Sequence, residues 1–410
     1  MRVSESLTAL LPPDALASPD SGAEWSPQGA PPELVVRPGS TEEVAAVMSW
    51  ASAQGVGVLP IGSGRRAPDV HGGPGPHIVL STRRLVGIDV YESADLTFTA
   101  SAGTLLATID GVLRENGQWT PFDPPHVLER TLGGLVAAGE SGPLWMGYGE
   151  LRNHVLGMTV VTGDGRILRL GGRVVKNVAG FDVLKPMVGS RGTLAVITAV
   201  CLRTFPEPAV DRLLVLRGES VGGLVASARA IGTASVMPVS SVLVDRLDVL
   251  DAGAALVVRL HGERPTVDAD QAVLERHVGT AFESVSNPGD VGTAIQNHAA
   301  DAHLVVSVLP SRLSECLAIL NRLGPIAVAV DTYAAGVRLS LAEIDVEAIR
   351  GARDSIERLG GALRVVPLPA TRPSDDGGSR PTAEVVDLNA RLVDVFDPSG
   401  VLWPTRGPVT

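Results

Sequence analysis

Residues 56–69 read Val-Gly-Val-Leu-Pro-Ile-Gly-Ser-Gly-Arg-Arg-Ala-Pro-Asp, and this stretch decides how the rest of the chain is interpreted. Apolar residues predict a strand that runs into Pro60, and Gly62, Ser63 and Gly64 predict a tight turn after it. Glycine leaves backbone N–H groups uncovered and adopts positive φ readily, so successive N–H groups in such a turn can form a concave anion-binding site. We therefore predict that this turn holds a pyrophosphate.

The turn matches neither of the common phosphate-binding motifs. A Rossmann fingerprint needs a third glycine and a helix that begins in the loop, whereas Ala67 and Pro68 follow here. A P-loop ends in Gly-Lys-Ser/Thr, and that ending is absent. Taken alone, the Gly-Ser-Gly turn is also compatible with an ordinary connection between a strand and a loop.

A second glycine-rich stretch spans residues 131–142 and reads Thr-Leu-Gly-Gly-Leu-Val-Ala-Ala-Gly-Glu-Ser-Gly. Small residues let a flat ligand or another backbone segment approach closely. If Gly133 and Gly134 begin a short helix, their N–H groups point at an anion. The alternative is that these glycines only permit close packing of the backbone.

Composition narrows the possible classes of protein. A formal net charge of −11 argues against a nucleic-acid binder, and no window holds the roughly 18 apolar residues of a membrane span. Pro12 and Pro13 interrupt the start of the chain before any signal-peptide core. Cys201 and Cys316 are too few for an iron–sulfur cluster held by this chain alone and fit a reducing cytoplasm. The scattered histidines lack the spacing of a helical metal site, so no metal is expected.

Periodicity predicts the helices. Ser40 and Glu43 form a capping-box pattern before an apolar helical stripe, and Gly55 ends this first helix. A second helix is predicted from about Thr104 to Asn116, with Leu105 on its apolar face. After Pro208, strands alternate with helices, as in an α+β domain. The later helices are expected at about 221–231, 267–278, 311–323, 344–359 and 383–396.

These stretches together resemble the FAD-binding oxidoreductases of the vanillyl-alcohol oxidase superfamily. The string Gly171–Asp182 is similar to that of the FAD-binding subunit of glycolate oxidase, as is the C-terminal Asp-Pro-x-Gly at residues 397–400. The other motifs that carry the resemblance are Pro60–Arg66, Pro124–His126, Thr131–Ala137, Val155–Gly157 and Gly189–Thr198.

The resemblance implies an α+β fold with a PCMH-type FAD-binding domain of two subdomains and a smaller α+β cap domain over the isoalloxazine. It implies FAD as the cofactor, held without a covalent bond, because covalent relatives reach the ring with a histidine or cysteine, whereas Arg65 follows the turn here. A C-terminal helix would return to the FAD domain. The expected boundaries are 1–30 for an N-terminal arm, 31–207 for the FAD-binding domain, 208–369 for the cap, 370–382 for a linker, and 383–410 for the last helix and tail.

The expected FAD contacts come from the two glycine-rich stretches, the proline-rich segment before the second of them, and the strand after residue 191. They are Pro60, Ile61, Gly62, Ser63, Gly64, Arg65, Arg66, Pro124, Pro125, Thr131, Leu132, Gly133, Gly134, Ala137, Gly139, Ser141, Gly142, Gly192, Val196 and Ile197.

A flavin enzyme that oxidises a 2-hydroxy acid needs a cation for the carboxylate and a base for the hydroxyl proton. The candidate cations are Arg152, Arg65 and Lys176, and the candidate bases are His126 and His154. Each has a plainer interpretation, since a loop arginine can be a surface or phosphate contact and a histidine can be structural.

Three functions remain open from the sequence. The first is an FAD-binding subunit of a glycolate oxidase-like dehydrogenase that passes electrons from glycolate or D-lactate to a partner. The resemblance implies a second FAD subunit and an iron–sulfur subunit, in the cytoplasm or attached to the inner membrane through those partners. The second is a self-sufficient FAD-dependent alcohol or hydroxy-acid dehydrogenase. The third is a non-catalytic assembly subunit with a vestigial flavin site. The chain lacks the His-x-x-Gly-Asp-Gly-Asn-x-His metal-binding stretch of the larger catalytic subunit of the glycolate system, so it is expected to bind FAD without necessarily turning over substrate by itself.

Overall fold

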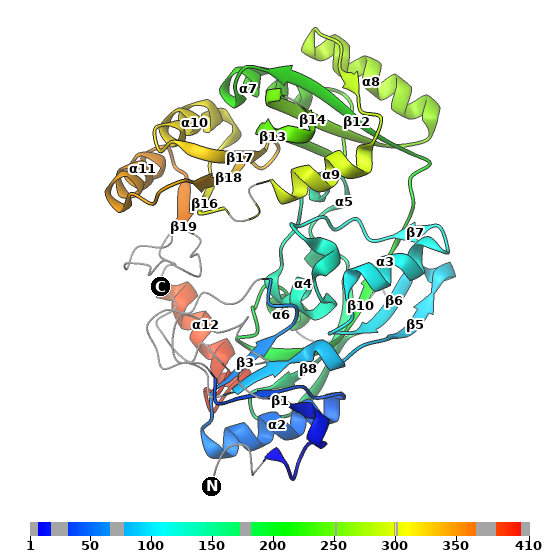
Figure 1. Cartoon of the computed structure of the whole chain (residues 1–410), viewed down its shortest axis with the longest axis vertical. Coiled ribbons are helices and arrows are strands. Elements are labelled where there is room, and N and C mark those ends of the chain that lie inside the picture. Colours follow the sequence, from blue (N-terminus) through cyan, green and yellow to red (C-terminus); the bar gives the residue numbers. More distant parts are fainter. Residues whose placement is uncertain are drawn as a thin grey trace.

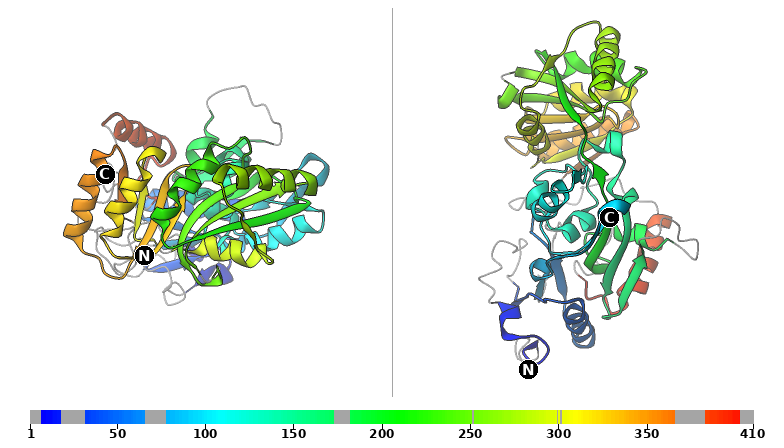
Figure 2. Two further views of the ribbon diagram at one scale, coloured as in Figure 1. Left: turned by 90° about the horizontal axis from the view of Figure 1, so that it is seen from above. Right: turned by 90° about the vertical axis from the view of Figure 1, so that its right-hand side faces the viewer.

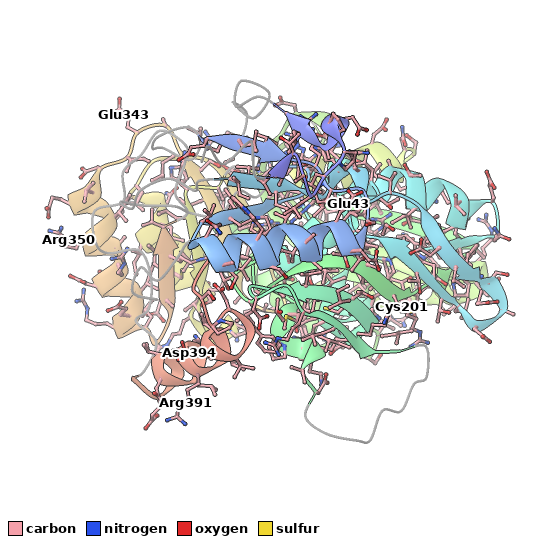
Figure 3. All side chains as sticks on the ribbon, turned by 90° about the horizontal axis from the view of Figure 1, so that it is seen from below. Glu43, Cys201, Glu343, Arg350, Arg391 and Asp394 are labelled. Carbon is pink, nitrogen blue, oxygen red and sulfur yellow. The ribbon has the colours of Figure 1, made fainter. Side chains whose placement is uncertain are left out.

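The computed structural model describes residues 7–17, 32–65, 78–172, 182–250, 252–298, 300, 302–365 and 383–402. Helices and strands are mixed throughout, as expected for the α+β class. Two sheets and the last helix occupy one end of the elongated molecule, and a third, larger sheet occupies the other (Figures 1 and 2). Charged side chains such as Glu343, Arg350 and Arg391 lie on the outside (Figure 3). Within the described residues, no helix has the length and apolar content to cross a membrane.

The first sheet carries the Gly-Ser-Gly turn at the end of one of its strands. Three of its strands are parallel, and helix α2 (Thr41–Gln54) packs on it. Ser40 Oγ accepts the N–H of Glu43 at 3.1 Å, as the capping pattern predicts, although the Glu43 carboxylate accepts from Gly39 N instead of Ser40 N. The strand order is β1 (Leu16–Ala17), β2 (Leu34–Val36), β4 (Ile78–Ser81), β3 (Val58–Ile61).

The second sheet is antiparallel and is covered by α3 (Leu106–Arg114) and α4 (Leu132–Ala138). The predicted position of Leu105 on the apolar face of α3 is wrong. Leu105 is the N-cap residue and is 43% exposed, because the helix begins one residue later and buries Leu106 instead. The strand order is β5 (Ile88–Glu92), β6 (Thr97–Ser101), β10 (Ala195–Arg203), β8 (Val155–Thr162), β9 (Ile167–Gly171).

Short elements connect this region to the rest of the chain. Strand β7 (Gln118–Trp119) pairs with β11 (Phe205–Pro206), where the chain leaves for the larger sheet. The short helices α5 (Trp145–Tyr148) and α6 (Leu184–Met187) follow α4 and β9 respectively.

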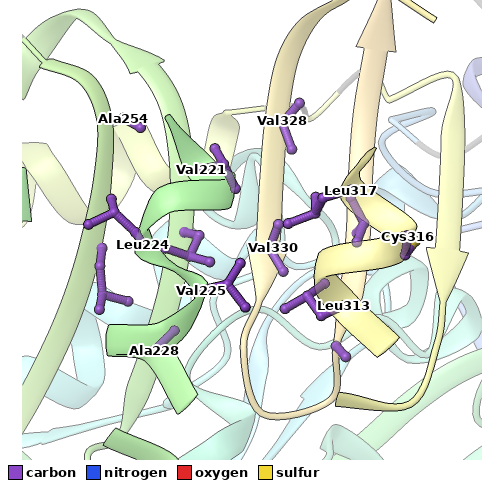
Figure 4. Close-up of a cluster of buried hydrophobic side chains, with 14 of the residues drawn as sticks. Val221, Leu224, Val225, Ala228, Ala254, Leu313, Cys316, Leu317, Val328 and Val330 are labelled. Carbon is purple, nitrogen blue, oxygen red and sulfur yellow. The ribbon is translucent and has the colours of Figure 1, made fainter. Parts of the chain in front are cut away.

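The third sheet has eight antiparallel strands, and its two faces are covered differently. Helices α7 (Val221–Gly232), α8 (Arg264–Val278), α10 (Leu313–Asn321) and α11 (Val346–Arg358) pack on one face. Figure 4 shows side chains of α7 and α10 in this core. All four helices were predicted. Helix α9 (Pro288–Asn297), which was not predicted, covers the other face. The strand order is β15 (Glu283–Ser284), β12 (Val210–Gly218), β14 (Ala252–Gly262), β13 (Ser240–Leu247), β17 (Pro325–Asp331), β18 (Gly336–Leu341), β16 (Leu304–Ser307), β19 (Ala362–Val365).

The C-terminal helix α12 (Ala383–Phe396) returns to the first two sheets, as expected, and buries Phe396 in the core of the second. The Asp397 carboxylate is buried and accepts N–H bonds from Val401 at 3.0 Å and Leu402 at 2.8 Å. Val401 O in turn accepts from Val58 N at 2.8 Å, and Leu402 forms a parallel bridge with Val58. Asp397 therefore holds the tail against β3, the strand that leads into the glycine turn.

Replacing Asp397 with alanine should lower the free energy of unfolding by about 3 kcal/mol, because two buried N–H groups would lose a charged acceptor. Urea denaturation measures the loss. Asp387→Asn is the control, since it breaks only the exposed i,i+4 pair with Arg391 and should change stability by less than about 0.5 kcal/mol. Equal effects of the two substitutions would contradict this role.

Candidate functional site

The two glycine-rich stretches meet in the structure. Strand β3 ends at Ile61 and the turn follows, while Thr131 caps α4 by accepting the N–H of Gly134 at 3.2 Å. A Cβ placed on Gly62 would lie 2.1 Å from Thr131 Oγ1 and 3.6 Å from Gly134 Cα. Only a residue without a side chain allows the turn and the helix cap to approach this closely.

Neighbouring side chains fix the turn from both sides. Arg83 Nη2 donates to Ser63 O at 3.0 Å, and Thr82 Oγ1 donates to Ile61 O at 3.4 Å. Arg65 forms an ion pair with Glu129, two residues before the α4 cap. The turn is thus tied to the loop after β4 and to the segment before α4.

The backbone donors of the two stretches differ. For Gly62, Ser63 and Gly64, no N–H partner is found among the described residues, and Gly64 has φ of +78°. In contrast, Gly133 N donates to Ala102 O at 2.8 Å, and Gly134 N donates to Thr131 Oγ1. The turn amides are therefore available to an anion, whereas the Gly133 and Gly134 amides are not.

The expectation that the N–H groups of Gly133 and Gly134 point at an anion is not met, because both are already bonded within the protein. A Cβ on Gly133 would lie 2.7 Å from the Ala102 side chain, so close packing explains this glycine. Gly134 and Ala137 are small and only partly buried, so their contact with a flat ligand stays a prediction. Leu132 is larger and fully buried, and its contact with the ligand also stays untested.

The remaining expected FAD contacts extend beyond this junction. Gly139 ends α4 with φ of +62°, and Gly192 faces the Pro60 ring at 3.5 Å from an added Cβ. Pro124 and Pro125 are buried, and Ser141 Oγ accepts the N–H of Leu151 at 3.3 Å. A Cβ on Gly142 would lie 1.9 Å from Asp123 O. Arg66 lies outside the described residues.

Val196 and Ile197 are a different case. They are neighbours on β10, so their side chains point to opposite faces of the sheet. Val196 is buried in the core under α2, and Ile197 in the core under α3 and α4. Their side chains therefore serve packing.

Three of the four catalytic candidates lie in the part of the chain that the structure describes, and each has different surroundings. Arg152 is exposed in the 3-10 turn Leu151–Asn153, and Lys176 lies outside the described residues. His126 has φ of +53°, and its N–H donates to Asn297 Oδ1 on α9 at 2.9 Å, so it lies where the FAD-domain region meets the larger sheet.

His154 has the surroundings of a structural residue. It is 6% exposed, with the Phe122 and Phe205 rings beside it. Its Nε2 lies 2.7 Å from Tyr148 O, and because a carbonyl only accepts, Nε2 carries the proton. Burial lowers the pKa of His154, with the Tyr148 hydrogen bond acting in the opposite direction.

Sequence reasoning missed a polar network on the α9 face of the larger sheet. Arg259 binds the Asp211 carboxylate through two bonds of 2.8 and 2.6 Å. His261 Nε2 lies 3.1 Å from the same carboxylate, and His261 Nδ1 lies 2.8 Å from the hydroxyl of Tyr148 on α5. Burial raises the pKa of Tyr148 to about 12. Burial alone would raise the pKa of Asp211, but hydrogen bonds from Arg259 and His261 outweigh it and hold that pKa below its usual range.

Asp123 is the other residue that was missed. Its buried carboxylate accepts the N–H of Leu144 at 2.9 Å, and burial raises its pKa to about 7 despite that bond and the charges of Arg259 and Arg338. A cavity of about 10 Å³ lies between Asp123 and Arg259. It has room for about one water molecule, so a 2-hydroxy acid does not fit it in this arrangement.

The sequence contained a signal for the Arg259–His261 network and for Asp123. Arg259 and His261 interrupt the apolar run of β14 at alternate positions, and Asp123 stands between apolar and proline residues. Both patterns indicate buried polar groups. Among the described residues, no group of three or more His, Cys, Asp or Glu side chains could hold a metal ion.

Comparisons with known proteins identify a flavin-binding domain in this chain. Residues 32–171 match the FAD binding domain family. The chain is 44% identical to glycolate oxidase subunit GlcE of Escherichia coli (strain K12), over 34% of this chain and 40% of that protein. It is 33% identical to a D-lactate dehydrogenase of Archaeoglobus fulgidus, over 48% of this chain and 44% of that protein. The chain thus spans less than half the length of these relatives.

The fold has solved counterparts. The structure of p-cresol methylhydroxylase with substrate bound superposes with a TM-score of 0.73 at 14% identity, over 97% of this chain and 94% of that one. The expected α+β fold is confirmed by this likeness, and the family match confirms an FAD-binding domain in residues 32–171.

Replacing Gly62 with alanine should displace Thr131 and the α4 cap, since the new Cβ would overlap Thr131 Oγ1. Overpacking costs about 1–3 kcal/mol. If this cost falls on the FAD-binding arrangement of the turn, FAD affinity drops roughly five- to 150-fold. The ratio of absorbance at the flavin band to that of the protein measures FAD retention. Gly111→Ala is the control, because nothing lies within 4 Å of its added Cβ and it sits inside α3. If Gly62→Ala retained as much FAD as the wild type, the turn would not be part of the FAD site.

Replacing Asp123 with asparagine should change how stability depends on pH. A carboxyl whose pKa rises from 3.8 to about 7 on folding destabilises the folded state as pH increases between these values. The stability of Asp123→Asn relative to the wild type should therefore increase over this range, by up to roughly 4 kcal/mol. Denaturation at a series of pH values measures the difference, and a flat difference would contradict the burial of this charge.

Proposed function

This chain carries an FAD-binding domain in residues 32–171, and from that premise we propose that it is the FAD-bearing subunit of a glycolate oxidase-like 2-hydroxy-acid dehydrogenase. The observation that carries the proposal is the contact between the Gly62 turn and the Thr131 cap, with turn amides that have no partner among the described residues. These donors and the small residues of α4 suit an extended dinucleotide. The similarity to a glycolate oxidase subunit supports 2-hydroxy acids as the substrate class.

We assign some of these residues to holding the cofactor and others to closing the site. The Gly62–Gly64 amides would hold the pyrophosphate, and Arg65 would stay fixed by Glu129. Bound FAD would supply the two-electron acceptor for the substrate carbon–hydrogen bond. Trp119, Tyr148 and His261 pack together where the FAD-domain region meets the larger sheet.

The described residues also favour dependence on partners. Arg65 and Arg259, which lie near the junction and the boundary, are each paired with a carboxylate, and the cavity beside Arg259 has room for one water molecule. At either of these two arginines, a substrate carboxylate would have to displace the partner. We propose that a second FAD subunit completes the substrate site.

Electrons must also leave the flavin. Cys201 and Cys316 are the two cysteines of the chain, both are buried, and one of them lies in the core of the larger sheet. They cannot supply the four thiolates of an iron–sulfur cluster. An iron–sulfur partner subunit is therefore proposed as the next carrier, and the complex rather than this chain would reach the final acceptor.

The test is anaerobic reduction of the purified chain. The chain alone should show a flavin spectrum that glycolate or D-lactate leaves unchanged, and the flavin should bleach after the partner flavoprotein and iron–sulfur subunits are added. Bleaching of the chain alone would establish the self-sufficient dehydrogenase instead. A colourless chain that binds no added FAD would establish the assembly subunit.

A further inference from the structure

Arg130 has a buried donor that the protein does not use. Its side chain is 3% exposed, and Nη1 donates to Glu140 Oε2 at 2.8 Å. The Nη2 group is buried and has no hydrogen-bond partner among the described residues. Leaving a charged donor unbonded in the interior is unfavourable, and buried polar groups nearly always find a partner, so this group is expected to have one outside the described residues, such as a bound ligand.

The backbone places Arg130 on the far side of the cap from the glycine turn. Arg130 and Thr131 are both extended, with ψ of 146° and 149°. Successive side chains of an extended segment point in opposite directions. Because Thr131 points at Gly62, Arg130 points away from the turn, and its guanidinium meets Glu140 just beyond the C-terminal end of α4.

The segment after Glu140 leads to the boundary with the larger sheet. Gly142 packs against Asp123, and Leu144 N donates to the Asp123 carboxylate beside the cavity that Arg259 lines. An extended dinucleotide whose pyrophosphate sits at the Gly62 turn has its redox-active ring some distance from that turn. Arg130 is therefore better placed for the ring than for the pyrophosphate.

We propose that Arg130 Nη2 donates to an oxygen or nitrogen acceptor on the pyrimidine portion of the bound flavin ring. The guanidinium then stabilises the negative charge that this portion gains when the flavin takes up two electrons. Glu140 holds the guanidinium in position through Nη1. The inference rests on the proposed binding of FAD and goes beyond it, since it assigns the group that sets the reduction potential.

The experiment compares Arg130→Met, Arg130→Lys and the wild type by two measurements. The first is the dissociation constant of FAD from the apoprotein. The second is the equilibrium between the flavin and a reference dye while xanthine and xanthine oxidase slowly reduce both. Arg114→Met is the control, because Arg114 is a half-exposed arginine of the same domain paired with Asp110.

Arg130→Met should shift the dye equilibrium at least tenfold toward oxidised flavin, which is about 30 mV for a two-electron couple. Arg130→Lys keeps the charge and should shift it less, and the Arg114→Met equilibrium should match the wild type. The lysine variant also preserves the test if Arg130→Met fails to fold. An unchanged dye equilibrium in both Arg130 variants would overturn the proposal. If FAD affinity then falls, Arg130 contacts the pyrophosphate instead. If FAD affinity also stays constant, Arg130 only pairs with Glu140. A wild type without flavin would instead refute the proposed cofactor site.

Discussion

The site depends on one close approach between backbone and side chain, at Gly62 and Thr131. A single methyl group at Gly62 would occupy the position of the Thr131 hydroxyl. That hydroxyl caps α4, and α4 packs on the second sheet, so the contact joins the two sheets of the FAD-binding domain. The ion pair of Arg65 with Glu129 closes the same junction from the outside. The geometry of the turn is thus fixed by α4 as much as by its own glycines.

The alternation of side chains along the strands of the larger sheet creates the second half of the site. On β14, Ala255 and Val257 face α9, so Arg259 and His261 fall on that same face by the two-residue period. Asp211 on β12 lies directly opposite His261, and it binds both of these residues. The charged end of an otherwise apolar face therefore meets Asp123 and Tyr148 of the other domain. This explains why the boundary is polar although the sheet core is not.

Sequence patterns correctly predicted the helices whose ends and apolar faces depend on residues close together in sequence. Ser40, Gly55 and the apolar stripe of α2 act within a few residues, and the predicted helix is present. Helix α9 was missed because Pro288, Gly289 and Gly292 resemble loop residues, although proline is well tolerated in the first turn of a helix. The Leu105 error has a similar origin, since periodicity does not fix the residue at which a helix begins.

The candidate site was only partly predictable for a different reason. The two glycine stretches could be found because each carries its own composition, but their contact joins residues far apart in sequence. The position of Asp123 beside the same cavity as Arg259 likewise depends on segments far apart in sequence. Gly133 shows the limit most clearly, because its sequence fits both an anion site and close packing, and only the Ala102 contact decides between them.

The contact between the tail after Asp397 and β3 makes the Gly62 turn depend on residues that are synthesised late. Strand β3 is flanked on one side by β4, and its Val58 also bonds to Val401 and Leu402, which the ribosome adds near the end of the described chain. During translation, the strand that carries the turn lacks this neighbour. The turn therefore reaches its final support only after α12 and the tail have emerged, so a nascent chain should acquire its flavin late, after the larger sheet has already had time to fold.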